Sequence, residues 1–288
     1  MERRLIITAD DLGIGPATSR GIVEVAARDR VTASTLLVNS PYAEHGLRLW
    51  RSAGQPCELG LHFCLTNEEP ISPSGRVASL VDQSGHFHSP AGLLGRLLSR
   101  QIDYDHLRTE LTAQYRRFCE LLGHAPTVVN GHHHVHALPL VREVVADVLR
   151  RGGVKPFVRR VHLSWGQVFA QPGQIVTQAM LKALCRPVPG TLGADSFAFL
   201  PTLDSPSQLD RFFRSLAKLP GQVVELCCHP GYPDETLEGR DPLTSQRVGQ
   251  LHLLQSAQFV QACRQAGFEL VSPSAATSPP RLRVVAAA

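Results

Sequence analysis

Residues 5–11 read LIITADD, an apolar run that ends abruptly on two adjacent carboxylates. A short run rich in branched apolar residues is typical of a strand buried on both faces of a parallel sheet. The chain repeats this pattern six more times, at residues 33–38, 58–65, 127–130, 158–163, 223–228 and 268–271. The expected sheet therefore has roughly seven strands.

Stretches with helical spacing separate these runs. Residues 104–122 and 139–150 each carry an apolar stripe, and Thr244 or Ser245 begins what we expect to be one long helix reaching Cys263. Alternating strands and helices predict parallel strands joined by helical crossovers. We predict an α/β fold, an irregular (β/α) barrel. The competing fold is an open, doubly wound sheet that binds a nucleotide. Such a sheet needs a glycine-rich turn after its first strand, where backbone amides bind phosphate, but this chain has two carboxylates there.

The length and composition bear on the domain organisation. A chain of 288 residues that is 43% hydrophobic can bury one large core. We expect residues 1–272 to form a single barrel domain and residues 273–288, which are rich in Pro and Ala, to be a disordered tail. Residues 66–92 are expected to form a lid or a binding loop, and residues 164–206 are irregular. We expect the loops at 66–100 and 164–206 to set the choice of substrate, and the sequence leaves their individual roles open.

The charge pattern excludes some classes of partner. The chain has 29 Lys and Arg against 25 Asp and Glu, a formal net charge of +4, with no basic cluster. We therefore expect no nucleic-acid partner. The seven Cys form no framework, and no segment is long enough to span a membrane or to be a signal sequence. We expect a cytoplasmic protein, and the sequence leaves open whether it is a homodimer.

Ionisable residues stand at the ends of several expected strands. Asp10 and Asp11 end the first, His62 lies at the end of the third, His132 follows the fourth, and His229 follows the sixth of the seven runs. In a parallel barrel the carboxyl ends of all strands meet at one face, where active sites are built. These five residues are therefore expected to lie close together.

The residue types indicate a metal-assisted hydrolysis. One Asp and two His form a common set for a divalent cation that keeps positions open for water and substrate. A second Asp is then free to act as general base, and a histidine across the site can protonate a leaving amine. This combination predicts the hydrolysis of a carbonyl compound.

Each residue also has a plainer interpretation. The aspartate pair could cap the helix that follows it, His62 could be a core histidine, and His229 could be a turn residue. Four His between positions 132 and 136 are rare and favour metal binding, although only one or two of them are expected to be ligands. His136 stays open as an alternative ligand, because it is four residues from His132.

Several short motifs, in their order and spacing, resemble those of the YdjC-like carbohydrate deacetylases, a family that includes the chitooligosaccharide deacetylases. The resemblance covers nearly the whole chain. It rests on TADDLG at 8–13, VTAS at 31–34, LVN at 37–39, GLH at 60–62, GHHHVH at 131–136 and HPGY at 229–232.

The resemblance implies a barrel of the polysaccharide deacetylase and glycoside hydrolase type. It also implies one divalent cation, Mg²⁺, Zn²⁺ or Co²⁺, held by Asp11, His62 and His132. By analogy with the polysaccharide deacetylases, Asp10 would be the general base and His229 the general acid. The implied enzyme is a carbohydrate N-deacetylase that releases acetate from an acetylated amino sugar, either chitooligosaccharide-like or a lipid-linked N-acetylglucosamine. The sequence does not identify the substrate-binding residues.

The chain departs from the family pattern at four positions. Leu12 stands where Phe is usual, Ser19 replaces Asn, Glu68 replaces Gly and Asn130 replaces Asp. We expect Asn130 to alter the support of His132, and Glu68 to bear on the choice of substrate. Two alternative functions stay open: a non-catalytic barrel that binds a metal and a sugar, and a metal-dependent hydrolase of another bond, such as a phosphoester.

Overall fold

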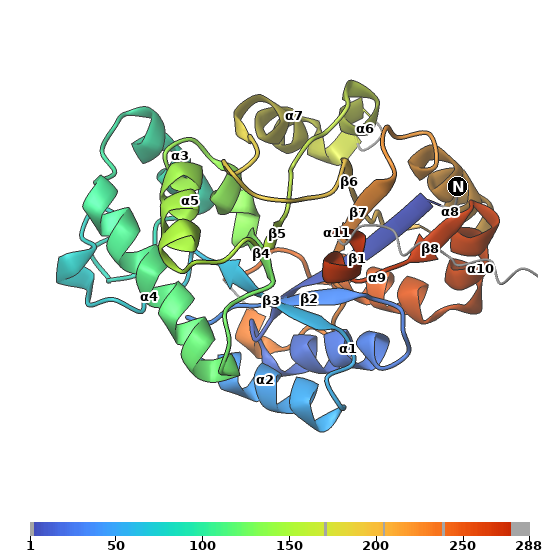
Figure 1. The fold of residues 1–288 in the computed structure, drawn as a ribbon, viewed down its shortest axis with the longest axis horizontal. Coiled ribbons are helices and arrows are strands. Elements are labelled where there is room, and N and C mark those ends of the chain that lie inside the picture. Colours follow the sequence, from blue (N-terminus) through green and yellow to red (C-terminus); the bar gives the residue numbers. More distant parts are fainter. Residues whose placement is uncertain (1–2, 170–171, 204, 238–239, 278–288) are drawn as a thin grey trace, which may run out of the picture.

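A computed structural model of the chain describes residues 3–169, 172–203, 205–237 and 240–277. Its centre is a parallel sheet (Figure 1). The strands are β1 (Arg3–Leu12), β2 (Ala33–Leu36), β3 (Glu58–Phe63), β4 (Val128–Gly131), β5 (Phe157–Val158), β6 (Ser196–Phe199), β7 (Val223–Cys228) and β8 (Phe268–Leu270).

Seven of these strands follow one another in the order β5-β4-β3-β2-β1-β7-β6, and every pair is parallel. The short β8 pairs with the first residues of β1. The sheet curls until its two edges approach, where a single parallel bridge joins Phe157 to Leu192. The prediction of an irregular barrel with roughly seven strands is confirmed.

Helices surround the curled sheet (Figure 1), as crossovers between parallel strands require. The α-helices are α1 (Pro16–Ala26), α2 (Ala43–Ser52), α3 (Pro90–Leu98), α4 (Tyr104–Leu122), α5 (Val141–Arg151), α6 (Trp165–Phe169), α7 (Ile175–Leu184), α8 (Pro206–Leu216), α9 (Ser245–Gln255), α10 (Ala257–Gln265) and α11 (Pro273–Thr277). Short 3₁₀ turns are η1 (Ser74–Arg76), η2 (His132–Ala137), η3 (Pro172–Gln174) and η4 (Glu235–Leu237).

The strands are buried because helices or the barrel interior cover both of their faces. All six residues of β7 are buried, and so are the last eight residues of β1. Since all strands run the same way, their carboxyl ends open onto one face of the barrel. Ionisable side chains at those ends therefore share one enclosed space.

The strands near the two edges of the sheet depart most from the expected pattern. The strand expected at 158–163 is only the two residues of β5. The amide of Arg159 still donates to the carbonyl oxygen of Val129 in β4, at 3.1 Å, and the chain leaves the sheet after it. Sequence reasoning missed β6, which pairs with β7 at the edge of the sheet. Its short SFAF run is preceded by an irregular segment rich in Pro and Gly, which conceals it.

The last long helix is also different. The chain has two helices, α9 and α10, where we expected one. Ser256 interrupts them, because its backbone is extended and its hydroxyl accepts a hydrogen bond from the amide of Phe259 at 3.2 Å. Serine at this position is a helix N-cap, and a cap starts a new helix.

The tail expected to be disordered begins with structure. Residues 273–277 form α11, and Ala276 is buried with Val128 and Phe157 in a small apolar cluster. Residues 278–288 lie outside the described part of the chain. Among the described residues, none of the helices combines the length and the apolar character needed to cross a bilayer.

Candidate active site

A bulge at the end of β1 turns two consecutive carboxylates into the barrel. Successive side chains of a regular strand point to opposite faces. Between Ala9 and Leu12, however, β1 advances three residues while β2 advances two, and Asp11 has a left-handed φ of 69°. An extra residue of this kind re-aims side chains at the rim of a sheet. As a result Asp10 and Asp11 are both buried and both line the same pocket.

Asp11 meets two imidazoles from other strand ends. Its Oδ1 lies 3.1 Å from Nε2 of His62 and 2.9 Å from Nδ1 of His132. Ligands bound to one cation at about 2.0–2.2 Å lie about 3.0–3.4 Å apart when their angle at the metal is 90–109°. One ligand atom from each of the three residues lies within 4.8 Å of the others, so the set fits a divalent cation.

Asn130 orients His62 for such a role. Its amide nitrogen donates to Oδ1 of Asp10 at 2.9 Å, which leaves its oxygen facing Nδ1 of His62 at 2.5 Å. An acceptor there keeps the proton on Nδ1, so Nε2 presents a lone pair. Nε2 is buried and has no hydrogen bond of good geometry among the described residues, as expected of a ligand atom. We expected Asn130 to act on His132; it contacts His62 and Asp10 instead.

The histidine cluster folds into the tight turn η2, which separates its members. His133 and His134 both have positive φ, so the four imidazoles do not share a helical face. Nε2 of His136 faces the carbonyl oxygen of Arg159 at 3.1 Å. In the described part of the chain, His136 belongs to neither group of residues that could hold a metal. The structure therefore places His132, and not His136, beside Asp11.

A buried arginine holds the other oxygen of Asp11. Arg247 of α9 donates to Oδ2 of Asp11 at 2.6 Å and also pairs with Asp241. Burial alone would raise the pKa of Asp11, but the Arg247 cation and His132 hold that pKa well below 3.8. Asp11 is therefore a carboxylate with Oδ2 engaged and Oδ1 directed at the imidazoles. We call Asp11, His62, His132 and Arg247 the Asp11 cluster.

Asp10 has a different partner. Arg159, which directly follows β5, donates to both carboxylate oxygens of Asp10, at 2.9 Å to Oδ1, and to Glu225 of β7 at 2.8 Å. Burial would raise the pKa of Asp10, but the Arg159 cation, helped by His62, brings it below its ordinary value of 3.8. Burial does raise the pKa of Glu225, against the effect of Arg159. Asp10 is thus a fixed carboxylate inside the barrel.

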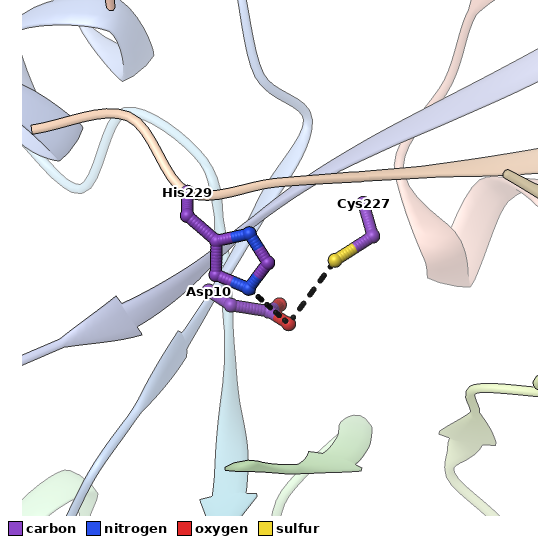
Figure 2. Close-up of side chains that lie close together, drawn as sticks. All are labelled: Asp10, Cys227 and His229. Carbon is purple, nitrogen blue, oxygen red and sulfur yellow. Dashed lines mark hydrogen bonds and ion pairs between the residues drawn. The ribbon is translucent and has the colours of Figure 1, made fainter. Parts of the chain in front are cut away.

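Two residues of the β7 end complete this side of the site (Figure 2). Sγ of Cys227 donates to Oδ2 of Asp10 at 3.3 Å, and Nε2 of His229 lies 3.9 Å from the same oxygen. The amide of His229 donates to Gln250 at 2.6 Å, which fixes the backbone at this point. Burial lowers the pKa of His229, and the two aspartates partly offset that effect. We call Asp10, Arg159, Glu225, Cys227 and His229 the Asp10 cluster.

A cavity of about 620 Å³ opens above both clusters, a size typical of small-ligand sites. Asp10, Asp11, His62, His132 and His229 all line it. Its walls are largely apolar, with Leu93, Leu94, Leu138, Met180, Leu181, Phe199, Leu200 and Leu243. A larger cavity, of about 1200 Å³, lies at the opposite ends of the strands and contains none of the five expected site residues.

The plainer interpretations can now be compared with the structure. Helix α1 has Gly15 as its N-cap and no side-chain cap, so the aspartates do not cap it. His62 and His229 both face aspartates inside the cavity. Glu68, expected to bear on substrate choice, forms an ion pair with Arg240 at 2.7 Å and is not among the residues that line the cavity.

Sequence reasoning missed the four charged residues that surround the aspartates. They are Arg159, Glu225, Asp241 and Arg247. Three of them carried a signal. Arg159 follows an apolar strand, Glu225 interrupts the VVELCC run, and Arg247 stands four residues before Leu251 on the apolar side of its helix. A charge in such a position is rarely buried unless it is paired.

Known proteins resemble this chain along most of its length. The family described as YdjC-like protein matches residues 4–265. The mouse (Mus musculus) protein named carbohydrate deacetylase is 33% identical over 289 residues, covering 93% of each chain. The Klebsiella pneumoniae protein named chitooligosaccharide deacetylase is 33% identical over 276 residues, covering 94% of this chain and 98% of its own.

A solved structure has the same fold. It is a protein of Enterococcus faecalis described as a cellobiose-phosphate cleavage protein, 24% identical in sequence, with a TM-score of 0.76. The likeness covers 96% of this chain and 99% of that one. At this level of identity the likeness concerns the fold alone.

Proposed function

The chain belongs to the YdjC-like protein family, and from that membership and the geometry of the two clusters we propose that it is a metal-dependent carbohydrate N-deacetylase. The proposed reaction hydrolyses the acetamide of an N-acetylated amino sugar to acetate and the free amine. The observation that carries the proposal is the meeting of Asp10, Asp11, His62, His132 and His229 in one cavity. The names of the two relatives, both carbohydrate deacetylases, support the same substrate class.

Asp11, His62 and His132 are the proposed ligands. A divalent cation bound there would supply Lewis-acid activation of a carbonyl group and of water. Two imidazoles favour a transition metal or zinc over Mg²⁺, although Mg²⁺, Zn²⁺ and Co²⁺ all stay candidates. Arg247 keeps Oδ2 of Asp11 engaged, which leaves Oδ1 for the cation.

The Asp10 cluster would manage the protons. Asp10, kept ionised by Arg159, accepts the proton of the attacking water through Oδ2, which faces the cavity beside His229. His229 then gives a proton to the nitrogen of the departing sugar amine. A binding protein without catalysis would need neither group, and this argues against the non-catalytic alternative.

The cavity walls favour a particular kind of acetylated sugar. They are mostly apolar, with Leu93, Leu138, Leu181 and Phe199 among the side chains that line them. Met180 of α7 lines the cavity and is itself 39% exposed, so the apolar lining reaches the protein surface. A pocket lined mainly by apolar side chains suits a ligand with an apolar part. We therefore favour an N-acetylated amino sugar linked to an apolar group over a free chitooligosaccharide.

Acetate release tests the reaction class. The metal-free protein is supplied in turn with Zn²⁺, Co²⁺ and Mg²⁺ and given N,N′-diacetylchitobiose, an alkyl glycoside of N-acetylglucosamine, or p-nitrophenyl phosphate. We expect metal-dependent acetate release from at least one acetylated sugar and no phosphate release. Hydrolysis of the phosphoester alone would favour the alternative hydrolase, and metal binding with no hydrolysis of any substrate would favour the binding protein.

The alkyl chain tests the substrate choice. Each buried methylene group contributes about 0.8 kcal/mol, so four of them against the apolar wall should raise kcat/KM about 200-fold over the methyl glycoside. Met180→Gln, on the wall of the cavity, should reduce this preference, whereas Leu98→Gln, 65% exposed on α3 and outside the cavity lining, should leave it unchanged. Equal kcat/KM for methyl and octyl glycosides would exclude an apolar subsite.

A further inference from the structure

Three possible ligand atoms converge beside the proposed catalytic metal site. Sγ of Cys227 lies 3.3 Å from Oδ2 of Asp10, Nε2 of His229 lies 3.9 Å from the same oxygen, and all three ligand atoms are within 4.8 Å of one another (Figure 2). We propose that Asp10, Cys227 and His229 form a second, inhibitory site for a thiophilic divalent cation such as zinc or cadmium.

The strand itself brings these ligands together. Side chains two residues apart on β7 point to the same face, so Glu225 and Cys227 both face the barrel interior. His229 directly follows β7 and lines the same cavity as Cys227. Asp10 belongs to β1, whose Ala9 is paired with Cys228 in the neighbouring strand. The arrangement therefore follows from the register of two adjacent central strands and does not depend on a flexible loop.

The distances suit a tetrahedral cation. Zinc binds sulfur at about 2.3 Å and nitrogen or oxygen at about 2.0–2.2 Å, so its ligand atoms lie about 3.3–3.6 Å apart. The sulfur–oxygen distance of 3.3 Å already has this value, and the nitrogen–oxygen distance of 3.9 Å is slightly longer. A small rotation of the His229 ring, whose side chain is 22% exposed, would shorten it. The fourth position would face the cavity, which all three residues line.

The surrounding charges permit a second cation. Asp10 and Arg159 balance each other, and Arg159 need not leave, because Oδ2 of Asp10 can contact both a guanidinium and a metal. A Cys227 thiolate would supply one of the two negative charges needed. Glu225 lies on the same guanidinium, and its Oε2 has no hydrogen-bond partner among the described residues, so it can supply the other.

The thiol makes the site selective among metals. Without a metal, burial raises the pKa of Cys227 well above 9, so the group is a thiol that donates to Asp10. A thiophilic cation displaces the thiol proton to solvent as the metal–sulfur bond forms. Mg²⁺, which prefers oxygen ligands, does not. Zinc and cadmium are therefore expected to occupy the site, and magnesium is not.

Occupation would block the reaction proposed above, on which this consequence rests. The second cation would take Oδ2 of Asp10 and Nε2 of His229, the proposed base and acid. An enzyme activated by one equivalent of zinc or cobalt would thus be inhibited by further zinc. Binding itself does not depend on the proposed reaction and can be measured separately.

Cadmium titration tests the site directly, because thiolate–cadmium bonds absorb in the ultraviolet. The metal-free protein is titrated with Cd²⁺, and both the equivalents bound and the absorbance are recorded. We expect two tight equivalents, with the absorbance rising during the second. Cys227→Ser should bind one equivalent without that rise, and Cys227→Ala should behave alike. Cys228→Ser is the matched control, because that thiol points the other way, toward the carbonyl of Thr8, and it should keep both equivalents.

Activity gives the second measurement. For each protein, the rate of acetate release with excess Zn²⁺ is compared with the rate of the same protein without excess Zn²⁺. Excess Zn²⁺ should lower the rate at least ten-fold in the parent protein and in Cys228→Ser. In Cys227→Ser it should lower the rate less than two-fold. A single cadmium equivalent in the parent protein, or two in both Cys227 variants, would overturn the proposal. If cadmium binds as expected but no metal supports acetate release, the second site stands and the proposed function fails. Circular dichroism checks that each variant is folded.

Discussion

Asp10 and Asp11 are consecutive in the chain, yet their carboxylates have different surroundings. In the Asp11 cluster one oxygen faces two imidazoles and the other accepts from Arg247. In the Asp10 cluster both oxygens accept hydrogen bonds from Arg159, and the imidazole of His229 stays 3.9 Å from Oδ2. One carboxylate is left with an acceptor oxygen for a cation, and the other is kept charged and immobile.

The difference shows how one bulge can serve two chemical purposes. A regular strand would direct only one of the two side chains into the barrel. The left-handed backbone at Asp11 brings in both. Separate arginines, one directly after β5 and one on α9, then give each carboxylate its own environment. Ligand and base can therefore be tested separately by substitution.

The largest expected effect is on the Asp11 cluster. His62→Ala removes a proposed ligand and should weaken metal binding more than about 100-fold, since even residues that only support a ligand cost 10–100-fold. Acetate release should fall to background. Metal titration and acetate release measure the two effects. His86→Ala, an exposed histidine near Glu69, is the control and should change neither. Unchanged metal affinity in His62→Ala would remove His62 from the site.

Asp10→Asn should separate the two clusters. Affinity for the first metal equivalent should stay, because the Asp11 cluster is intact, while kcat should fall about 10²–10⁴-fold with the loss of the general base. Arg159 keeps Glu225 as a partner, so the protein should still fold. The same two measurements apply. Retained turnover would exclude Asp10 as the base.

Arg159→Met should affect stability. It leaves the buried carboxylate of Asp10 without its cation, a change that costs about 3–5 kcal/mol when one partner of a buried pair is removed. Unfolding in urea measures this. The adjacent Arg160→Met is a matched control: Arg160 is half-buried and donates to a carbonyl oxygen, so its loss should cost about 1 kcal/mol. An equal loss of unfolding free energy in the two variants would mean that the buried pair of Arg159 and Asp10 does not stabilise the fold.

The smallest effect is expected for His136→Ala. The variant loses the contact with the carbonyl oxygen of Arg159 and should cost about 1–3 kcal/mol of stability. Metal affinity should not change, because His136 lies outside the Asp11 cluster. A metal titration of His136→Ala and of His132→Ala decides which of the two histidines is a ligand. Loss of metal binding in His136→Ala would mean that His136 is one.

Sequence patterns predicted the parts of the molecule whose signal is local. β1 and β7 are visible as apolar runs, and the residues that end them are at the barrel mouth for a general geometric reason. The helix at 104–122 matches α4 at both ends, because Asp103 caps it and Gly123 ends it in a left-handed conformation.

The rest depends on contacts that are distant in the chain. Asp10 and Arg159 are 149 residues apart, and Asp11 and Arg247 are 236 apart. A single sequence gives no measure of such pairings. The sequence also could not show which of His132 and His136 lies beside Asp11. That depends on the positive φ angles of His133 and His134, a conformation that histidine seldom adopts.

The left-handed backbone of Asp11 limits how this site can be lost over evolutionary time. Among ordinary residues Asn and Asp accept such a conformation most readily, whereas most others are strained by about 1–2 kcal/mol. A single exchange to Asn at position 11 would thus preserve the architecture while removing the anionic oxygen. Homologues with Asn there are expected to be well-folded descendants that have abandoned turnover, and the same exchange offers a way to capture an uncleaved sugar for crystallography.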